Sequence, residues 1–371
     1  MKIGILTLTL HTNYGGILQA YALQTVLERM GHEVEVLNRP FTPQKTKWMQ
    51  IPKRIVKKML GRDVVIFSER RYNREAPVIN KAIWDFRKKY IHERFVNSLH
   101  DIKEDDYDCI VVGSDQVWRP KYFKEQWKTG IEDAYLAFTK GWKIKRIAYA
   151  ASFGVDTWEY TEEETAKCKE AISLFDNVSV REKTSIYLCE EFFHTNVRWM
   201  IDPTLHLCSQ DYISILGEQR AGSSKYLLTY ILDSTPVKEQ LANSVAKQKG
   251  IKRVDLKRVT NNLSPMNEKI LCSVESWLEG FRDADFVVTD SFHGCVFSII
   301  FNKPFVVMTN IERGACRISS LLEMFHLENN LIANYDGFNP NASYIPNVKE
   351  IFSEWRSGSM EYLNKTIRKN E

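Results

Sequence analysis

The sequence lacks the cysteine spacing that zinc sites and redox proteins use. It has seven cysteines, an odd number, and no two of them form a C-x-x-C pair. They are scattered along the chain as Cys109, Cys168, Cys189, Cys208, Cys272, Cys295 and Cys316. Because zinc ligands and redox cysteines typically occur in close pairs, we expect reduced thiols, no metal site and no cofactor.

Long uncharged hydrophobic runs are also missing. No basic N-terminal region is followed by an apolar run of signal-peptide length, and no apolar stretch is long enough to cross a bilayer. We therefore expect the protein to stay in the cytoplasm.

The chain as a whole has no strong charge of one sign. Its net charge of +4 is small for 371 residues, which argues against a nucleic-acid-binding protein with many phosphate contacts. The charge is nevertheless uneven, since the segment from Gln44 to Glu75 has ten Lys or Arg residues and three acidic residues. Within it, the stretch from Pro52 to Gly61 is typical of a short basic amphipathic helix.

Neither of two common nucleotide-binding motifs is present. The turn Asn13-Tyr14-Gly15-Gly16 has two glycines, but it has neither the G-x-G-x-x-G spacing nor the Walker lysine, so we predict no NAD and no ATP. Placed at a helix N-terminus, these residues can bind an anion or a hydroxyl through backbone N–H groups. A purely structural tight turn is the alternative.

The alternation of apolar runs predicts an α/β protein with two Rossmann-like domains. A strand over 2–10, a helix over 17–30 and a strand over 33–37 open the first domain as a parallel strand-helix-strand unit, and the second half repeats the alternation. We also expect a helix over 84–95 and one that starts with the Thr161 and Glu164 capping box. The domains are predicted as 1–204 and 205–347, and a last helix in 348–371 would return to the first domain.

Ligands of open α/β sheets bind beyond the carboxyl ends of the strands. Five predicted loops occupy such positions, and they carry Asn13 to Gly16, Ser114 to Trp118, Ser152 to Gly154, Arg181, and Asp290 to Gly294. The loop with Asp115, Gln116 and Trp118 suits sugar hydroxyls and stacking on a sugar ring, with helix capping and core packing as alternatives. Arg181 suits a phosphate or carboxylate, or a salt bridge to Glu182 or another neighbour.

His293 is the strongest candidate for a catalytic residue. It follows Asp290 and Ser291 at a predicted strand-to-helix turn, so an imidazole stands beside a carboxylate and a hydroxyl at the positive end of a helix. Further positive charge follows in Lys303, Arg313 and Arg317.

Together these motifs resemble the polysaccharide pyruvyl transferase family over nearly the whole chain. They are Asn13-Tyr14-Gly15-Gly16, Gly113-Ser114-Asp115-Gln116-Val117-Trp118, Ser179-Val180-Arg181-Glu182, Asp202-Pro203-Thr204 and Thr289-Asp290-Ser291-Phe292-His293-Gly294. The resemblance implies a GT-B-like pair of domains with an interdomain cleft, phosphoenolpyruvate as donor, and a pyruvyl ketal on a sugar of a surface polysaccharide as product. His293 and Arg181 match family motifs. Ser291 departs from the pattern, because several better-known members carry Arg there, and the donor phosphate would then need Arg317 or Lys303.

The resemblance and the chemistry assign roles as follows. His293 acts as acid or base, and Asp290 or Asp115 orients it or receives a hydroxyl proton. The donor side comprises Arg181, Ser291, Lys303 and Arg317. The acceptor side comprises Asn13, Tyr14, Gly15, Gly16, Ser114, Gln116 and Trp118. The acceptor would be a glycan or lipid-linked saccharide, so the basic segment 45–74 has two interpretations: solvated helix faces, or peripheral contact with the inner membrane face.

Two other functions fit the same features. A GT-B glycosyltransferase using a nucleotide sugar shares the fold, and Glu312 or Glu323 could hold its ribose hydroxyls. A carbohydrate-binding protein without turnover would keep the same cleft.

Overall fold

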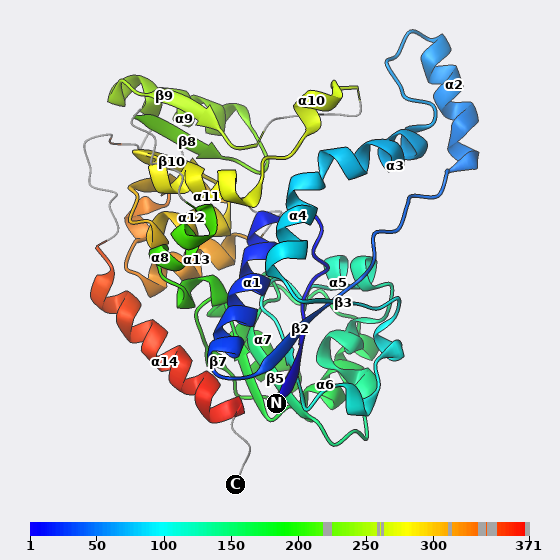
Figure 1. The fold of residues 1–371 in the computed structure, drawn as a ribbon, viewed down its shortest axis with the longest axis vertical. Coiled ribbons are helices and arrows are strands. Elements are labelled where there is room, and N and C mark those ends of the chain that lie inside the picture. The colour runs from blue at the N-terminus through cyan, green and yellow to red at the C-terminus, as the bar shows by residue number, and fades with distance from the viewer. Residues whose placement is uncertain are drawn as a thin grey trace.

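The structure is a computed structural model, and it describes residues 1–217, 225–257, 260, 263–310, 314–332, 339 and 347–367. Its strands form two parallel sheets, each flanked by helices (Figure 1). The expected α/β architecture with two Rossmann-like halves in a GT-B-like arrangement is thereby confirmed. Arg313, which was expected to add positive charge after His293, and Glu312, which was named for the ribose hydroxyls of a nucleotide sugar, lie outside the described residues.

The first sheet has seven strands in the order β3-β2-β1-β4-β5-β6-β7. They are β1 (Lys2–Leu6), β2 (Glu33–Asn38), β3 (Glu93–Phe95), β4 (Cys109–Val112), β5 (Lys145–Ala151), β6 (Asn177–Val180) and β7 (Arg198–Trp199). Every residue of β4 is buried, as expected for a central strand of a parallel sheet that is covered on both faces.

The second sheet has four parallel strands in the order β11-β10-β8-β9. They are β8 (Tyr226–Tyr230), β9 (Lys252–Asp255), β10 (Phe286–Thr289) and β11 (Phe305–Val307). All four residues of β10 are buried, so this short apolar strand lies at the centre of the second half and leads directly into the segment with His293.

The helices of the first half are α1 (Tyr14–Arg29), α2 (Ile51–Met59), α3 (Ser68–Ile79), α4 (Lys81–Tyr90), α5 (Pro120–Trp127), α6 (Glu162–Ile172) and α7 (Thr184–Leu188). Those that follow are α8 (Ser209–Leu216), α9 (Pro236–Lys249), α10 (Met266–Lys269), α11 (Val274–Asp283), α12 (Phe292–Ile300), α13 (Ala315–Met324) and α14 (Lys349–Ile367).

Local signals predicted some boundaries well and others poorly. The capping box of α6 is confirmed, since the Thr161 hydroxyl accepts from Glu164 N and the Glu164 carboxylate accepts from Thr161 N. The helix expected over 84–95 was wrong at its end, because α4 stops at Tyr90 and 93–95 form β3. Strand β3 pairs in parallel with β2, and this tertiary pairing overrides the helical pattern.

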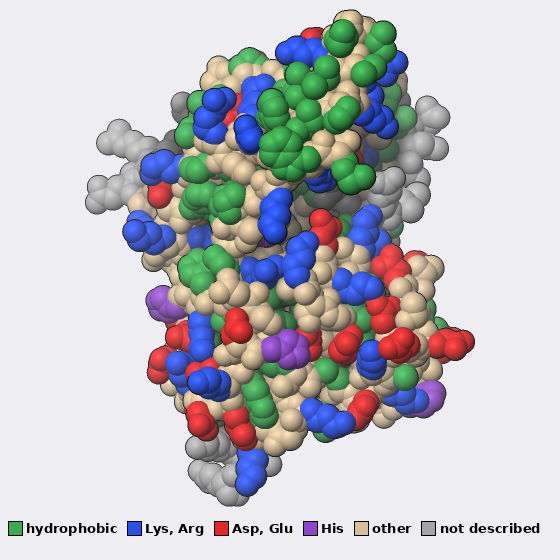
Figure 2. Space-filling model, turned by 90° about the vertical axis from the view of Figure 1, so that its right-hand side faces the viewer, with side chains coloured by type: hydrophobic (Ala, Val, Ile, Leu, Met, Phe, Trp, Pro, Cys, Tyr) green, Lys and Arg blue, Asp and Glu red, His purple; other side chains and the backbone are tan. Residues whose placement is uncertain are grey.

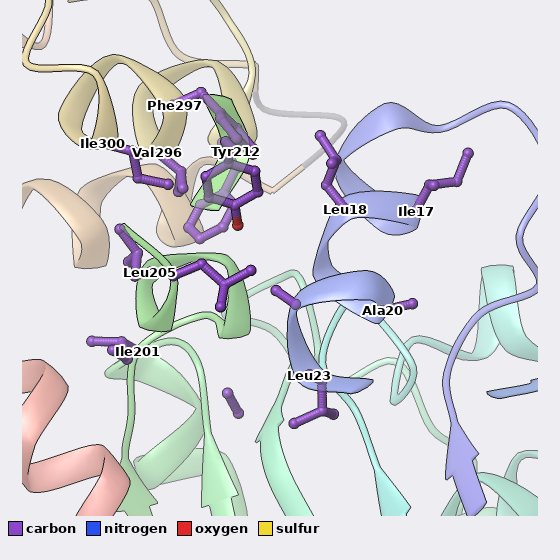
Figure 3. Close-up of a cluster of buried hydrophobic side chains, with 14 of the residues drawn as sticks. Ile17, Leu18, Ala20, Leu23, Ile201, Leu205, Tyr212, Val296, Phe297 and Ile300 are labelled. Atoms are coloured by element: carbon purple, nitrogen blue, oxygen red, sulfur yellow. The ribbon is translucent and has the colours of Figure 1, made fainter. Parts of the chain in front are cut away.

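One hydrophobic core joins the two halves. It contains Ile5 of the first sheet and Val287 of the second, both fully buried. Figure 3 shows part of this core, in which side chains between α1 and α12 join the two helices; it labels Ile17, Leu18, Ala20, Leu23, Ile201, Leu205, Tyr212, Val296, Phe297 and Ile300. Because this shared core is apolar, it holds the loops of the two sheets in a fixed relation.

The last helix, α14, packs against the first half. Lys145 Nζ on β5 donates to Thr366 O at 3.0 Å, and the Tyr362 ring lies 6.4 Å from that of Tyr149. The domain boundary at residue 204 stays a prediction. Within the described ranges, no helix has the length and apolar character needed to cross a membrane.

Candidate active site

A cavity of about 730 Å³ lies at the carboxyl ends of both sheets. The strand order reverses between β1 and β4 in one sheet and between β8 and β10 in the other, and such reversals open a crevice for ligands. Residues after all four of these strands line the cavity: Thr12, Gln116, Leu232 and Ser291. The two crevices therefore form a single site between the halves.

His293 is the second residue of α12, and it lies in the wall of this cavity. The helix starts there because Ser291 caps it, with its hydroxyl accepting from Gly294 N at 3.4 Å. The imidazole Nε2 lies 3.8 Å from Asp202 Oδ2 and has no hydrogen-bond partner among the described residues. Burial lowers the pKa of His293 to about 4, and the opposing effect of Asp202 is smaller. The ring is therefore neutral at pH 7.

The first turn of α1 lies against the imidazole. This helix begins at Tyr14 rather than at Ile17, so Gly15 and Gly16 are helical and do not form a preceding turn. A Cβ at Gly15 would overlap the His293 ring, and one at Gly16 would lie 3.1 Å from Asp115 Oδ2. Glycine therefore suits both positions, because the His293 ring and the Asp115 carboxylate occupy the space that a side chain would need.

Arg181 follows β6 and is buried behind the residues that line the cavity. Its Nη1 donates to Asp202 Oδ2 at 2.8 Å, and its Nη2 lies 3.7 Å from Asp115 Oδ1. Burial opposes its charge, but Asp202, Glu182 and Asp115 outweigh burial and keep the pKa of Arg181 above its usual value. Of the two interpretations from the sequence, the salt bridge is present, with Asp202 as the bonded partner.

Arg317 on α13 brings a second guanidinium to the same place, and it lines the cavity. Its guanidinium carbon lies 5.8 Å from the centre of the Phe292 ring, and that of Arg181 lies 4.6 Å from it. Burial, followed by repulsion from Arg181, lowers the pKa of Arg317 to about 10. It is still protonated at pH 7, so it places a positive charge in the wall that also contains His293.

Asp290 has partners that differ from those expected. Its two oxygens accept hydrogen bonds from the backbone N of Leu232 and Asp233, from Lys238 Nζ at 2.7 Å and from Asn310 Nδ2 at 3.1 Å. Because four donors occupy this carboxylate, it ties the loop after β8 to the loop after β10. This bonding suits a positioning residue better than a proton acceptor.

Besides Arg181, Gly15 and Gly16, three more predicted site residues do not line the cavity. Trp118 is fully buried, its ring lies 4.8 Å from that of Tyr135, and its Nε1 donates to Ala134 O, so it packs in the core instead of stacking on a sugar. Ser114 is also fully buried and donates to Ala150 O at 2.7 Å. Lys303 precedes β11 and so lies at the amino end of that strand, whereas the cavity lies at the carboxyl ends. Burial lowers the pKa of Lys303.

Three of the predicted acceptor-side residues do line the cavity, namely Asn13, Tyr14 and Gln116. Asn13 is exposed, and Gln116 is buried with its Oε1 lacking a hydrogen-bond partner in the described part of the chain. Tyr14 crosses to the second half, where its hydroxyl donates to Cys272 O at 2.8 Å. Tyr14 therefore fixes α1 to the opposite wall.

Asp202 was not singled out from the sequence as a candidate site residue. Asp202-Pro203-Thr204 was named only as one of the family motifs, but the carboxylate of Asp202 is fully buried between Arg181 and His293. Asp202 comes shortly after β7, so the strand-end rule that found Arg181 could also have found it. No strand-end signal in the sequence pointed to 267–272 or to the α5 residues Tyr122 and Gln126, which also line the cavity. We refer to His293, Arg181, Arg317, Asp202 and Asp115 as the His293 cluster.

The described residues contain no group of three or more His, Cys, Asp or Glu side chains that could hold a metal ion. Of the two arginines in the His293 cluster, Arg317 lines the cavity, where its guanidinium can bind a ligand that carries negative charge.

The fold and the site define a GT-B-like α/β protein whose site lies between two Rossmann-like halves. A sequence model of the polysaccharide pyruvyl transferase family matches residues 13–312. The chain belongs to this family, and it is a transferase of polysaccharide modification.

Solved structures give more distant matches. The UDP-GlcNAc 2-epimerase of Methanocaldococcus jannaschii is 13% identical, with a TM-score of 0.49 and 99% of this chain and 100% of that chain covered. The UDP-GlcNAc 2-epimerase of Neisseria meningitidis, solved with UDP-GlcNAc, is 11% identical, with a TM-score of 0.49 and 99% of each chain covered. No curated protein matches the chain.

Proposed function

We propose that this chain transfers the pyruvyl group of phosphoenolpyruvate to two hydroxyls of a sugar in a surface-polysaccharide precursor, forming a pyruvyl ketal. The observation that carries the proposal is the buried neutral imidazole of His293 in a cavity wall that also holds Arg317. Phosphoenolpyruvate has a carboxylate and a phosphate, so it needs cations, and its transfer needs a group that moves protons.

The donor would lie against α12 and α13. The N-terminus of α12 offers backbone N–H groups and the positive end of the helix dipole, and Arg317 adds a full charge. These groups would take the place of the arginine that several better-known members carry at the position of Ser291. Arg181 acts through Asp202 and not on the donor itself, because it keeps the Asp202 carboxylate ionised and in place beside His293.

The reaction requires a balanced set of bond changes. The methylene carbon of the donor gains a proton and becomes a methyl group, and the neighbouring carbon bonds to two sugar oxygens as its bond to the phosphate oxygen breaks. The two hydroxyls lose two protons, of which one balances the new methyl group and the other leaves with phosphate. Neutral His293 accepts a hydroxyl proton, and its charged form, stabilised by Asp202, delivers a proton to the methylene carbon.

The acceptor sugar would lie against the other wall. Asn13, Asp115 and Gln116 provide polar groups there, and Tyr122 rather than Trp118 provides an aromatic face. The rival nucleotide-sugar function has less support in this cavity, since Glu323 forms an ion pair with Lys183 and is not one of the lining residues.

Ligand-dependent melting distinguishes the two transferase functions. A ligand that binds the folded state raises Tm, so we expect phosphoenolpyruvate to raise it and UDP, GDP and CDP to leave it unchanged. Stabilisation by a nucleotide but not by phosphoenolpyruvate would overturn the proposal.

Turnover distinguishes the transferase from a carbohydrate-binding protein. We expect phosphate release from phosphoenolpyruvate only when a suitable acceptor is added from a panel of galactosides, glucosides and mannosides. Sugar binding without phosphate release across the panel would favour the binding protein.

A further inference from the structure

Residues 48–79 form an arm that projects α2 away from both sheets (Figure 1). It contains the turn Trp48–Gln50, α2 and α3. Apolar residues recur along α2 and its C-terminal end at a helical spacing, as Pro52, Ile55, Val56, Met59 and Leu60. No residue of α2 is buried; Met59 is 82% exposed and Leu60 is 72% exposed. An apolar stripe at this spacing normally faces a core, but here it faces solvent.

The polar side of α2 is the side that contacts the protein. Arg54 donates two hydrogen bonds to the carboxylate of Glu69 on α3, at 2.7 and 2.8 Å, and a third to Ile66 O at 3.0 Å. A bidentate arginine-carboxylate pair fixes orientation as well as position. The arm is thus built to present the apolar stripe outward.

Cations surround the stripe. From residue 48 to residue 74 there are eight Lys or Arg residues and two acidic residues, and Arg54 and Arg71 form ion pairs with Glu69 and Glu75. A hollow of about 820 Å³ lies beside α2, and its lining includes the basic residues Lys58, Arg62, Arg70, Arg71 and Arg74. Figure 2 shows hydrophobic side chains gathered at the top of the molecule with Lys and Arg side chains beside them.

We propose that the arm docks on a membrane surface that contains anionic phospholipid. The stripe on α2 enters the boundary between headgroups and acyl chains, and the cations around it, including those of the hollow, contact lipid phosphates. A second copy of the chain is a poorer partner for this surface, because pairing two arms would bring like charges together.

The chain segment 263–272 connects the arm to the cavity, so docking of the arm has a consequence for catalysis. Leu263 lines the hollow, and 267–272 line the cavity. Arg71 donates to Ser264 O at 3.3 Å and Leu271 N donates to Ile79 O at 3.2 Å, so the arm holds the segment between them. If the proposed function is right, docking brings the acceptor side of the cavity towards saccharides that are carried on lipid.

Vesicle flotation with the full chain tests the docking without donor or acceptor, so its result does not depend on the proposed function. We expect the protein to float with vesicles of equal parts phosphatidylglycerol and phosphatidylcholine, and to float far less with phosphatidylcholine alone. Added salt should release it.

Two double variants examine the stripe and the cations separately. Met59→Ser with Leu60→Ser, and Lys53→Gln with Lys58→Gln, should each lower vesicle binding at least about tenfold. Lys143→Gln with Lys349→Gln, a matched exposed pair outside the arm, should bind as the parent does. All these variants should keep the parent's circular dichroism and Tm.

The result that overturns the docking is equal flotation with both vesicle types, or arm variants that float as the parent does. A parent that is dimeric by sedimentation velocity, and that becomes monomeric with Met59→Ser and Leu60→Ser, would assign the stripe to a second copy and would also overturn it.

Discussion

The His293 cluster and the arm depart from ordinary burial in opposite directions. In the cluster, charged side chains such as Arg181 and Asp202 are buried and paired with one another. In the arm, apolar side chains such as Met59 and Leu60 are exposed and are surrounded by cations. Burying charge and exposing a continuous apolar stripe both have a free-energy cost, so each region indicates a ligand or surface that the isolated chain does not contain.

The two regions also differ in the substitutions that they can tolerate. The cluster is packed and hydrogen-bonded, and the loss of one member leaves the others buried without a partner. The arm has few packing contacts to lose, and its exposed side chains can change without affecting the fold. Variants of the charged cluster residues should therefore affect stability, and replacing His293 should affect activity, whereas variants of exposed arm residues should affect membrane binding alone.

The largest expected effect is that of His293→Ala on turnover. Removing a residue that moves protons lowers the rate by about 10²- to 10⁴-fold, and since the imidazole of the parent is neutral and buried, Tm should change little. Phosphate release with a working acceptor measures the rate. Met59→Ala, with a soluble acceptor, is the matched arm variant and should keep the parent's rate. Retained turnover in His293→Ala would remove His293 from its proposed role.

Arg181→Met should give the next largest effect, on stability. It leaves the Asp202 carboxylate buried without its cation, which costs about 3–5 kcal/mol, and urea denaturation measures the loss. Arg62→Met in the arm should stay within about 0.5 kcal/mol of the parent. Adding Asp202→Asn to Arg181→Met should recover part of the stability, and a single variant that unfolds at the parent's urea concentration would contradict the buried ion pair.

Gly15→Ala tests the packing of α1 on the imidazole. The new Cβ must displace the His293 ring, which should cost about 1–3 kcal/mol of stability and should lower turnover as well. Gly358→Ala is the matched control, because nothing lies within 4 Å of its Cβ position in α14, and Ala at a helical position there should be neutral or slightly stabilising. Equal stability of the two variants would show that the ring is not held against α1.

The smallest expected effect is a change in stability with pH that depends on His293. Its pKa is about 4 in the folded state, against a usual value of 6.5, so the unfolded chain binds the proton first as the pH falls below 6.5. Stability from this residue is complete above pH 6.5 and declines towards pH 4, by about 2 kcal/mol between pH 7 and pH 5. His293→Gln should have a shallower decline in urea denaturation at these two pH values. His206, whose burial lowers its pKa to about 3, contributes in the same direction and remains in both proteins. Identical declines would mean that His293 is not desolvated.

Strand and helix patterns predicted much of the fold, because apolar periodicity reports which face of an element is buried. The α/β alternation, the α6 capping box and the position of His293 at the start of a helix after a strand all followed from local sequence. The short strand β3 did not, because its pairing with β2 depends on a partner more than fifty residues away in the chain.

For the site, local pattern was enough to identify strand-end loops as the place to look, and five motifs in order were enough to indicate the family. Tertiary contacts decided which of those loops share a cavity, and they moved Trp118, Ser114 and Lys303 out of its wall. They also brought Asp202 between Arg181 and His293, and they turned the apolar stripe of α2 towards solvent through the pairing of Arg54 with Glu69. The physical reason is the same in each case: a residue's own neighbours in sequence determine its element and face, but its partner, burial and pKa depend on segments that only folding brings together.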